Sequence, residues 1–329
     1  MEKFDLKDRK ILYHLNLDSR QSFRSIGRKV GLSKDIVASR VKRLQKLGII
    51  RNFRTRISLT PLGYNIVRNY YVFQNINPSI RKEIIDYFIS NQITMAVISL
   101  EGSYDLLVIT QDKNMLKIKS FFDQFLTKYR DYILKQASSI YLKSSWFDLS
   151  FLLKDKDEIK ETKNIIDERK IPEANNKIKE INIDDLDYKI LRNLAINSRI
   201  PSTELAMKTK STVSIIQYRI KKLIKSNIIK GYGVGLDLRK LGYRFYHVDL
   251  TLKDLSKRAQ IINYICKNPN LCCIEEAIGH SSDLELEFFF NNTEILHNIM
   301  DNLTMKFPNC IKNYDFFCYL DSYKSVYME

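Results

Sequence analysis

The sequence contains one ordered pattern twice. Shifting the chain by 179 residues aligns Asp5 with Asp184, and the match runs without a gap to Tyr64 against Tyr243. The register then moves by about one residue and continues to the end of the chain. Later matches along this register are Gly102/Gly279, Asp105/Asp283, Ile133/Ile311 and Tyr141/Tyr319. Such a series identifies a tandem duplication with a unit of about 150 residues, so the fold must be built from two related copies.

The two copies are separated by a segment of different composition. Residues 154–182 are charged, interrupted by Pro172 and poor in aromatic residues, which is typical of a linker. Its start, 154–163, could continue as a polar helix, whereas 172–176 indicates a loop. The 329 residues suffice for four small domains. We expect two domains in each repeat, joined by a linker. They are 1–64 and 65–153 in the first repeat, the linker 154–182, and 183–243 and 244–329 in the second repeat.

The positive charge is confined to the first part of each repeat. The formal net charge is +16. Residues 1–64 contain 16 Lys and Arg against 5 Asp and Glu, and residues 180–243 contain 12 against 6. The remainder of the chain is nearly neutral. Restriction to matching segments weakens, but does not remove, the alternative of a solvated face with an incidental Lys bias. We expect a polyanionic partner, double-stranded DNA.

Residues 7–59 carry the pattern of a winged helix-turn-helix. Ile11, Leu12 and Leu15 share one face of a first helix, and Ser22 can cap a second. Gly31 supplies the turn, and Ser33 caps a third helix that ends near Leu47. We expect the third helix to bury Ile36, Val37, Val41 and Leu44 and to enter the major groove. The alternation in 49–59 predicts a hairpin wing.

These residues resemble the Lrp/AsnC (leucine-responsive regulatory protein/AsnC) family of prokaryotic transcription regulators. The motifs are Asp8-x-x-Ile11-Leu12-x-x-Leu15, Asp18-Ser19-Arg20, Val30-Gly31-Leu32-Ser33, Val37-x-x-Arg40-Val41-x-x-Leu44 and Gly48-Ile49-Ile50. The resemblance implies a following ferredoxin-like α/β domain, which mediates dimerisation and often binds amino acids.

The second part of each repeat has the matching element order. In the first repeat, apolar segments at 69–73, 94–100, 106–110 and 140–142 predict strands, and 80–90 and 114–129 predict helices. The second repeat follows with 245–252, 259–266, 271–277, 284–290, 295–307 and 314–320. This β-α-β-β-α-β order is ferredoxin-like, so the fold class is α+β. We expect 65–153 and 244–329 to form an intramolecular pseudo-dimer, with further self-association left open.

The candidate DNA contacts follow from the outward positions of the third helices and from the wing. In the first repeat they are Ser33, Lys34, Ser39, Lys42, Arg43, Arg51, Arg54 and Arg56. In the second repeat they are Ser214, Gln217, Tyr218, Lys221 and Lys222. The second repeat has drifted: Lys210 replaces Gly31, Asn227 replaces Gly48, and the wing 230–235 has lost its arginines. Whether the second unit still reads DNA stays open.

A Gly-containing turn between the second and third strands is where members of this family contact an amino-acid effector. A carboxylate and backbone N–H groups there could hold an α-amino and an α-carboxylate group, although Gly and Asp are also ordinary turn residues. The candidate effector contacts are Gly102, Ser103, Tyr104, Asp105, Gly279, Ser281, Ser282 and Asp283.

Motifs for catalysis, metal or cofactor binding are missing. The five cysteines have no zinc-site spacing and are expected to be buried thiols. The histidines do not cluster in sequence, and there is no P-loop or GxGxxG. No apolar run or leader indicates membrane insertion or export, so we expect a cytoplasmic regulator. Two alternatives remain: a ligand-sensing or assembly module without DNA readout, and a sirohaem decarboxylase-like enzyme, whose His-rich strand motif is missing here.

Overall fold

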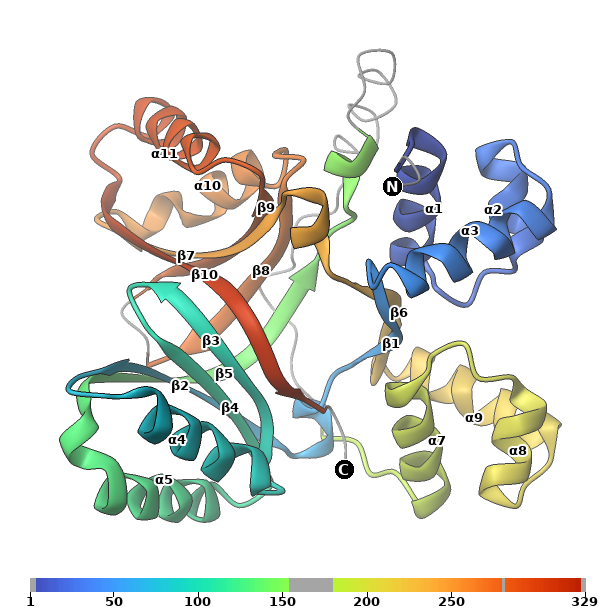
Figure 1. Cartoon of the computed structure of the whole chain (residues 1–329), viewed down its shortest axis with the longest axis horizontal. Helices are drawn as coiled ribbons and strands as arrows, with labels where there is room; N and C mark the ends of the chain where they lie inside the picture. The colour runs from blue at the N-terminus through green and yellow to red at the C-terminus, as the bar shows by residue number, and fades with distance from the viewer. Residues whose placement is uncertain (1–3, 154–179, 280–281, 327–329) are drawn as a thin grey trace.

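Two helical units lie beside one closed sheet. The structure, a computed structural model, describes residues 4–153, 180–279 and 282–326. The expected linker therefore lies outside the described residues over 154–179. The helical units occupy one side of the molecule and the sheet, with its four covering helices, occupies the other (Figure 1). The helical units consist of α1 (Leu6–Leu17), α2 (Phe23–Val30) and α3 (Lys34–Lys46), and of α7 (Asp185–Ile196), α8 (Ser202–Thr209) and α9 (Val213–Lys225).

The helix boundaries in the first unit follow from local chemistry. Asp5 and Asp8 cap α1 reciprocally, each carboxylate accepting from the other's backbone N–H. Ser22 and Ser33 cap α2 and α3, as expected, and Gly31 ends α2 in the left-handed conformation. In the second unit Lys210 adopts that conformation at φ 53°. The prediction that Ile36 is buried is wrong: it is 46% exposed, because α3 turns only its Val37/Val41/Leu44 face inward.

The expected hairpin wing is also wrong. Residues Ile50–Ile57 form a single strand, β1, which pairs antiparallel with β6 (Ile229–Leu236) of the other repeat. The wing segment of each unit therefore completes a two-stranded sheet between the units. The glycines of β6 make this possible, because a Cβ at Gly235 would lie 2.2 Å from Asn52 Oδ1 and one at Gly233 would lie 3.1 Å from an Arg56 nitrogen.

The ferredoxin-like order is confirmed in both repeats. The first contains β2 (Asn65–Phe73), α4 (Pro78–Ser90), β3 (Thr94–Gly102), β4 (Leu106–Asp112), α5 (Met115–Tyr129) and β5 (Ile133–Trp146). The second contains β7 (Arg244–Leu252), α10 (Arg258–Ile265), β8 (Leu271–Ile278), β9 (Leu284–Phe290), α11 (Glu294–Lys306) and β10 (Ile311–Ser325). Short 3-10 helices are η1 (Thr60–Leu62), η2 (Arg130–Tyr132), η3 (Ser150–Leu153), η4 (Leu238–Leu241) and η5 (Leu255–Lys257).

The two four-stranded sheets join along both edges. The strand order is β10-β3-β4-β2-β5-β8-β9-β7, which closes into a barrel. The last strand of each repeat crosses to the other: β5 pairs with β8, and β10 pairs with β3. A closed sheet leaves no unpaired edge for another chain to extend. The pseudo-dimer expected within one chain is thus present as a continuous sheet.

Each helical unit has a core completed by the other repeat. The core of the first unit includes Val234 and Leu238, together with Phe151 from η3. The core of the second unit includes Leu59 and Leu62. The ferredoxin-like cores lie between the sheet and its covering helices. All five cysteines are buried thiols, as expected. No helix in the described part of the chain is long and apolar enough to cross a bilayer.

Candidate nucleic-acid interface

The third helix of each unit presents most of its predicted contact residues to solvent. On α3, Lys34, Ser39 and Lys42 are exposed, as is the capping residue Ser33. On α9, Ser214, Gln217, Tyr218, Lys221 and Lys222 are all exposed. Both helices begin at a hydroxyl cap, Ser33 or Thr212, which accepts from a backbone N–H in the first turn. These side chains are available to a partner.

Arg43 is placed differently from the expectation that it faces outward. Its Nη2 lies 2.5 Å from Oδ2 of Asp8, whose side chain is fully buried at the start of α1. Arg40 also pairs with Asp8, at 3.0 Å, and with Asp5, at 2.8 Å. Asp8 is buried, so its charge requires these partners. Arg43 therefore fixes α3 to α1, a role that sequence reasoning missed.

The second repeat contains the counterparts of the Arg40 pairs, whereas Lys222, the counterpart of Arg43, is exposed. Arg219 lies 2.7 Å from Asp184 and 3.2 Å from Asp187. Arg219 and Asp187 are the 179-residue counterparts of Arg40 and Asp8. The conserved spacing between the repeats was the available signal for this structural role, because both partners recur together.

The three arginines predicted on a wing lie on the strand that joins the units. Arg51 forms an ion pair with Asp237 of the other repeat. Arg56 donates to the carbonyl oxygen of Asn16 at 3.1 Å and lies 5.8 Å from the ring of Trp146. Arg54 is half-buried and opposite Gly233. These arginines contribute to the contact between the repeats, and any contact with DNA would come from the strand face and not from a wing tip.

Reciprocal arginines hold the two helical units in one orientation. Arg20 donates to the carbonyl oxygens of Ser198 and Ile200, at 2.5 and 3.3 Å. Its counterpart Arg199 donates to those of Ser19 and Gln21, the latter at 3.0 Å. Burial, reinforced by the charge of Arg20, lowers the pKa of Arg199. The units are therefore locked by the same contact made twice.

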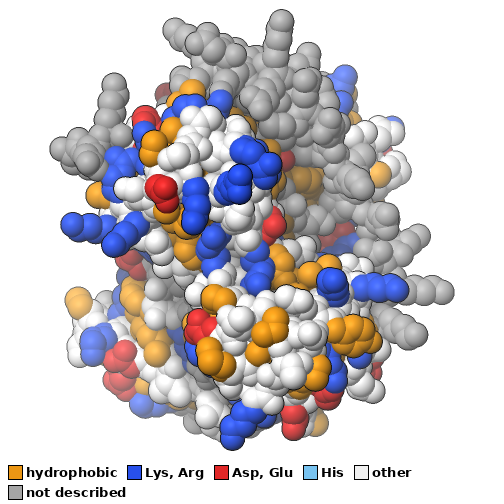
Figure 2. All heavy atoms as spheres, turned by 90° about the vertical axis from the view of Figure 1, so that its right-hand side faces the viewer, with side chains coloured by type: hydrophobic (Ala, Val, Ile, Leu, Met, Phe, Trp, Pro, Cys, Tyr) orange, Lys and Arg blue, Asp and Glu red, His pale blue; other side chains and the backbone are white. Residues whose placement is uncertain are grey.

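The exposed surfaces of the two units differ in kind. Figure 2 looks onto both units and shows Lys and Arg side chains over the upper, first unit and more hydrophobic side chains over the lower, second one. Ile196, Met207 and Tyr218 of the second unit are 76%, 74% and 66% exposed. The duplication has thus produced two equivalent helical units whose exposed surfaces differ in charge and hydrophobicity.

The two predicted effector turns are held by contacts within their own repeat and with the other repeat. The Asp105 and Asp283 carboxylates accept from the backbone N–H groups of Phe73 and Leu252, at 2.8 and 2.7 Å. A Cβ at Gly102 would lie 2.8 Å from the carbonyl oxygen of Phe316. The hydroxyl of Ser103 donates to the same carbonyl oxygen at 3.2 Å.

The other residues of these turns are partly engaged as well. Tyr104 is buried beside Tyr70 and Phe317. Gly279 has φ +100° and lies against the backbone of Ser138. Ser282 is half-exposed, and Ser281 lies outside the described residues. Effector binding at these turns stays a prediction.

A polar cluster inside the barrel escaped sequence reasoning. Arg68, which is 3% exposed, pairs with Glu275 and Glu285 at 2.5 Å each. His247 and Glu287 lie in the same interior. The histidines of this chain are far apart in sequence, so their spacing did not indicate a site here. The available signal was strand β9, where Glu285 and Glu287 alternate with apolar residues in a segment predicted to be a strand. Alternation placed them on one face, but only closure of the barrel shows that this face is interior.

Comparison with known proteins fits this architecture. The AsnC-type helix-turn-helix domain model matches residues 4–45 and 183–224. The HTH-type transcriptional regulator Ptr1 of Methanocaldococcus jannaschii is 34% identical over 117 residues, which cover 36% of this chain and 78% of that protein. The regulatory protein AsnC of Haemophilus influenzae is 47% identical over 62 residues, covering 19% of this chain and 41% of that protein.

A solved structure matches the whole arrangement. The siroheme decarboxylase NirDL superposes with a TM-score of 0.62 over 98% of this chain and 93% of that chain, at 9% identity, which concerns the fold alone. The sequence relatives, by contrast, are regulators, and the helix-turn-helix model matches once in each repeat. This chain belongs to the Lrp/AsnC family of transcription regulators.

Proposed function

We propose that this chain is a regulator that binds double-stranded DNA with both helical units and reads a different half-site with each. The observation that carries the proposal is the reciprocal Arg20/Arg199 contact, which holds two equivalent helices, α3 and α9, in a fixed pair. A homodimeric regulator presents two identical helices and so reads a palindrome. Here the paired helices differ, so the operator is asymmetric.

The exposed side chains suggest how each half-site is read. Gln217 has the amide geometry that pairs bidentately with adenine, and Lys42 suits guanine or phosphate. Arg43 is occupied by Asp8 and is therefore not assigned to a base. Half-site centres would lie about one helical turn apart, roughly 34 Å, or a multiple of it.

Gel-shift titrations of the full chain on DNA fragments test this proposal. Binding should weaken steeply with salt, because each neutralised phosphate contributes a slope of about 0.9 in log K against log salt. Absence of binding to any duplex would favour the alternative of an assembly or ligand-sensing module. DNA binding also places the protein with the chromosome, in the cytoplasm of a prokaryotic cell.

An amino-acid effector forms a finer part of the proposal. The Asp105 and Asp283 carboxylates already accept backbone hydrogen bonds, so a ligand would use their remaining acceptor capacity and the turn backbone. Thermal shift with a panel of amino acids tests this. Asp105→Asn and Asp283→Asn should abolish any stabilisation, whereas an unchanged shift in both variants would place the effector elsewhere.

Sirohaem decarboxylation remains the second candidate, favoured by the whole-chain fold likeness to NirDL. Its support is weaker, because the decarboxylase-like motif is rich in histidine. Within the described residues, the barrel interior contains a single histidine, His247. A cavity of about 350 Å³ is lined by Arg239, Tyr243 and Arg244. Both of its arginines are already in ion pairs, Arg239 with Asp321 and Arg244 with Glu101. A spectral change on adding sirohaem, with carboxyl loss seen by mass spectrometry, would establish this activity.

A further inference from the structure

Among the described residues, the barrel interior contains more carboxyl groups than guanidinium groups. The second repeat contributes the carboxylates of Asp249, Glu275, Glu285 and Glu287, and the first contributes the guanidinium of Arg68. Each of the three guanidinium nitrogens of Arg68 has an acceptor, because its Nε also donates to Ser139 at 3.0 Å. Two carboxylates, Glu275 and Glu285, share this one cation. Buried charge of one sign is costly unless a cation or protons compensate it.

His247 is held as a ligand would be. Its ring stacks on Phe317 with centroids 4.6 Å apart and planes 9° apart. Its Nε2 lies 3.2 Å from Asp249 Oδ1. A carboxylate at one ring nitrogen fixes the proton there and directs the lone pair of the other nitrogen toward a metal. That other nitrogen, Nδ1, lies 3.4 Å from the Tyr319 hydroxyl and 3.9 Å from Glu287 Oε1.

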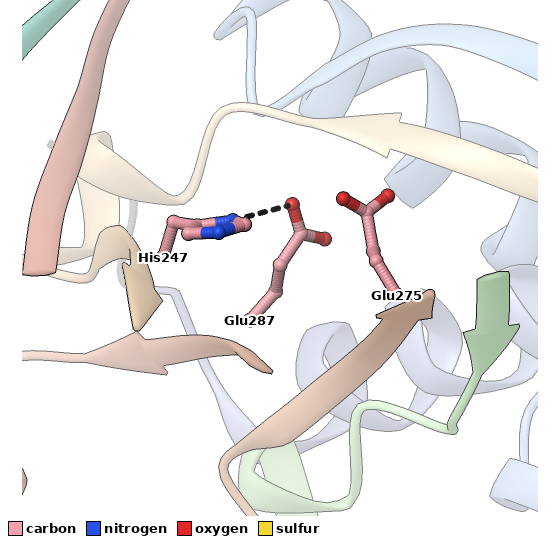
Figure 3. A group of neighbouring side chains, drawn as sticks. All are labelled: His247, Glu275 and Glu287. Atoms are coloured by element: carbon pink, nitrogen blue, oxygen red, sulfur yellow. Dashed lines mark ion pairs between the residues drawn. The ribbon is translucent and has the colours of Figure 1, made fainter. Parts of the chain in front are cut away.

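Glu287 supplies an independent observation. Its side chain is 6% exposed, and its Oε1 accepts from the Tyr319 hydroxyl at 2.9 Å. Its Oε2 is buried and has no hydrogen-bond partner among the residues that the structure describes. Figure 3 shows this carboxylate directed at the carboxylate of Glu275, with His247 on its other side. One ligand atom from each of His247, Glu275 and Glu287 lies within 4.8 Å of the others.

We propose that His247 Nδ1 and the carboxylates of Glu275 and Glu287 bind one divalent transition-metal cation inside the barrel. Mixed imidazole and carboxylate ligands favour Zn²⁺, Mn²⁺ or Co²⁺ over Ca²⁺, which takes oxygen ligands alone. With a neutral imidazole, a divalent cation brings the cluster to within one charge of neutrality. The site joins β7, β8 and β9, and Arg68 ties it to β2 of the other repeat. The proposal does not depend on DNA binding.

Metal binding to the full chain tests the site, with Co²⁺ as the spectroscopic probe. Protein dialysed against a chelator should bind one Co²⁺ per chain, develop visible absorption bands, and lose them when Zn²⁺ competes. Zn²⁺ should also raise the melting temperature in a concentration-dependent way. Glu287→Gln should weaken Co²⁺ binding about 10-fold or more, because it removes a charged ligand.

Glu276→Gln is the matched control. Glu276 adjoins Glu275 on β8 but pairs with Lys143 at 3.6 Å, so its variant should bind Co²⁺ as the unmodified chain does. If Glu287→Gln fails to fold, Asp249→Asn tests the same site, since loss of the residue that orients His247 should weaken Co²⁺ binding about 10–100-fold. Absence of Co²⁺ bands and of any melting shift, or equal binding by all variants, would overturn the proposal and leave protons as the compensating charge.

Discussion

The Oγ atoms of Ser19 and Ser198 lie 2.7 Å apart in a buried hydrogen bond, although 179 residues separate them in sequence. Their backbones are matched as well: Ser19 N–H donates to the carbonyl oxygen of Tyr232, and Ser198 N–H donates to that of Phe53. Phe53 and Tyr232 are also 179-residue counterparts. A pseudo-two-fold axis therefore passes between the two serines, and each helical unit contacts the same positions of its copy.

Arg199→Ala should destabilise this contact between the two helical units. It removes donors to the Ser19 and Gln21 carbonyls and the guanidinium 4.4 Å from the Phe23 ring. We expect a loss of about 1.5–3 kcal/mol, because hydrogen bonds from charged donors are lost in a partly buried site. Urea unfolding measures it. Arg20→Ala should behave alike, whereas Arg192→Ala, on the exposed face of α7, should stay within about 0.5 kcal/mol. Equal stability of all three variants would contradict the stabilising role of Arg20 and Arg199 between the helical units.

Arg68→Leu should be the more damaging arginine substitution in the barrel. It leaves the buried Glu285 and the half-buried Glu275 without their cation, which we expect to cost about 3–5 kcal/mol in the free energy of unfolding. Arg244→Ala breaks a pair with Glu101 in which both side chains are more than half exposed, and should cost at most about 1 kcal/mol. Thermal melts compare the two variants. A larger loss of stability in Arg68→Leu than in Arg244→Ala supports the interior pairing, and equal losses would contradict it.

His14 should make the first helical unit sensitive to acid. Burial, followed by the charges of Lys29 and Lys10, lowers the pKa of His14 to about 4. The unfolded chain has the ordinary histidine pKa near 6.5, so it binds more protons between about pH 6.5 and pH 4. Stability should therefore be complete above about pH 6.5 and fall as the pH drops toward 4. His14→Gln should remove part of that fall, as followed by circular dichroism from pH 7.5 to 4. A fall of the same size in the variant would assign the acid sensitivity to other groups.

The basic face of α3 should govern affinity for any duplex. Lys34→Ala and Lys42→Ala should each reduce the slope of log K against log salt by about 0.9 if each contacts a phosphate. Lys119→Ala, on the covering helix α5 and paired with Asp123, is the control and should leave the slope unchanged. Fluorescence anisotropy over a salt series gives the slopes. An unaltered slope in both α3 variants would mean that this helix does not approach DNA.

Local features could be predicted from the sequence because neighbouring residues determine them. Ser22, Ser33 and Gly31 specify where helices begin and end through hydrogen bonds and φ angles of their own segment. The ferredoxin-like order followed from apolar periodicity in the same way. The duplicated pattern also indicated that both halves of the pseudo-dimer belong to one chain.

Features that depend on a distant partner could not be predicted. The residues of β1 alternate as in any strand, and nothing local shows that its partner is β6 and not its own hairpin. Arg43 lies on a helix face that is outward in isolation, but the buried Asp8 attracts it. Arg68 and His247 occupy equivalent positions of the repeats. His247 lies opposite Glu287 within the sheet of its own repeat, whereas Arg68 reaches the cluster only where the two sheets join through β5 and β8.

Selection of binding sites from random DNA, with the unmodified chain and with Gln217→Ala, tests the central claim most directly. Two unlike helices in one fixed pair predict an asymmetric site, with half-site centres about one helical turn, or a multiple of it, apart. Gln217→Ala should relax base preference in one half-site only, at about 1–3 kcal/mol. A perfect palindrome in which both halves respond equally to Gln217→Ala would contradict the account, because it would require identical units from two chains.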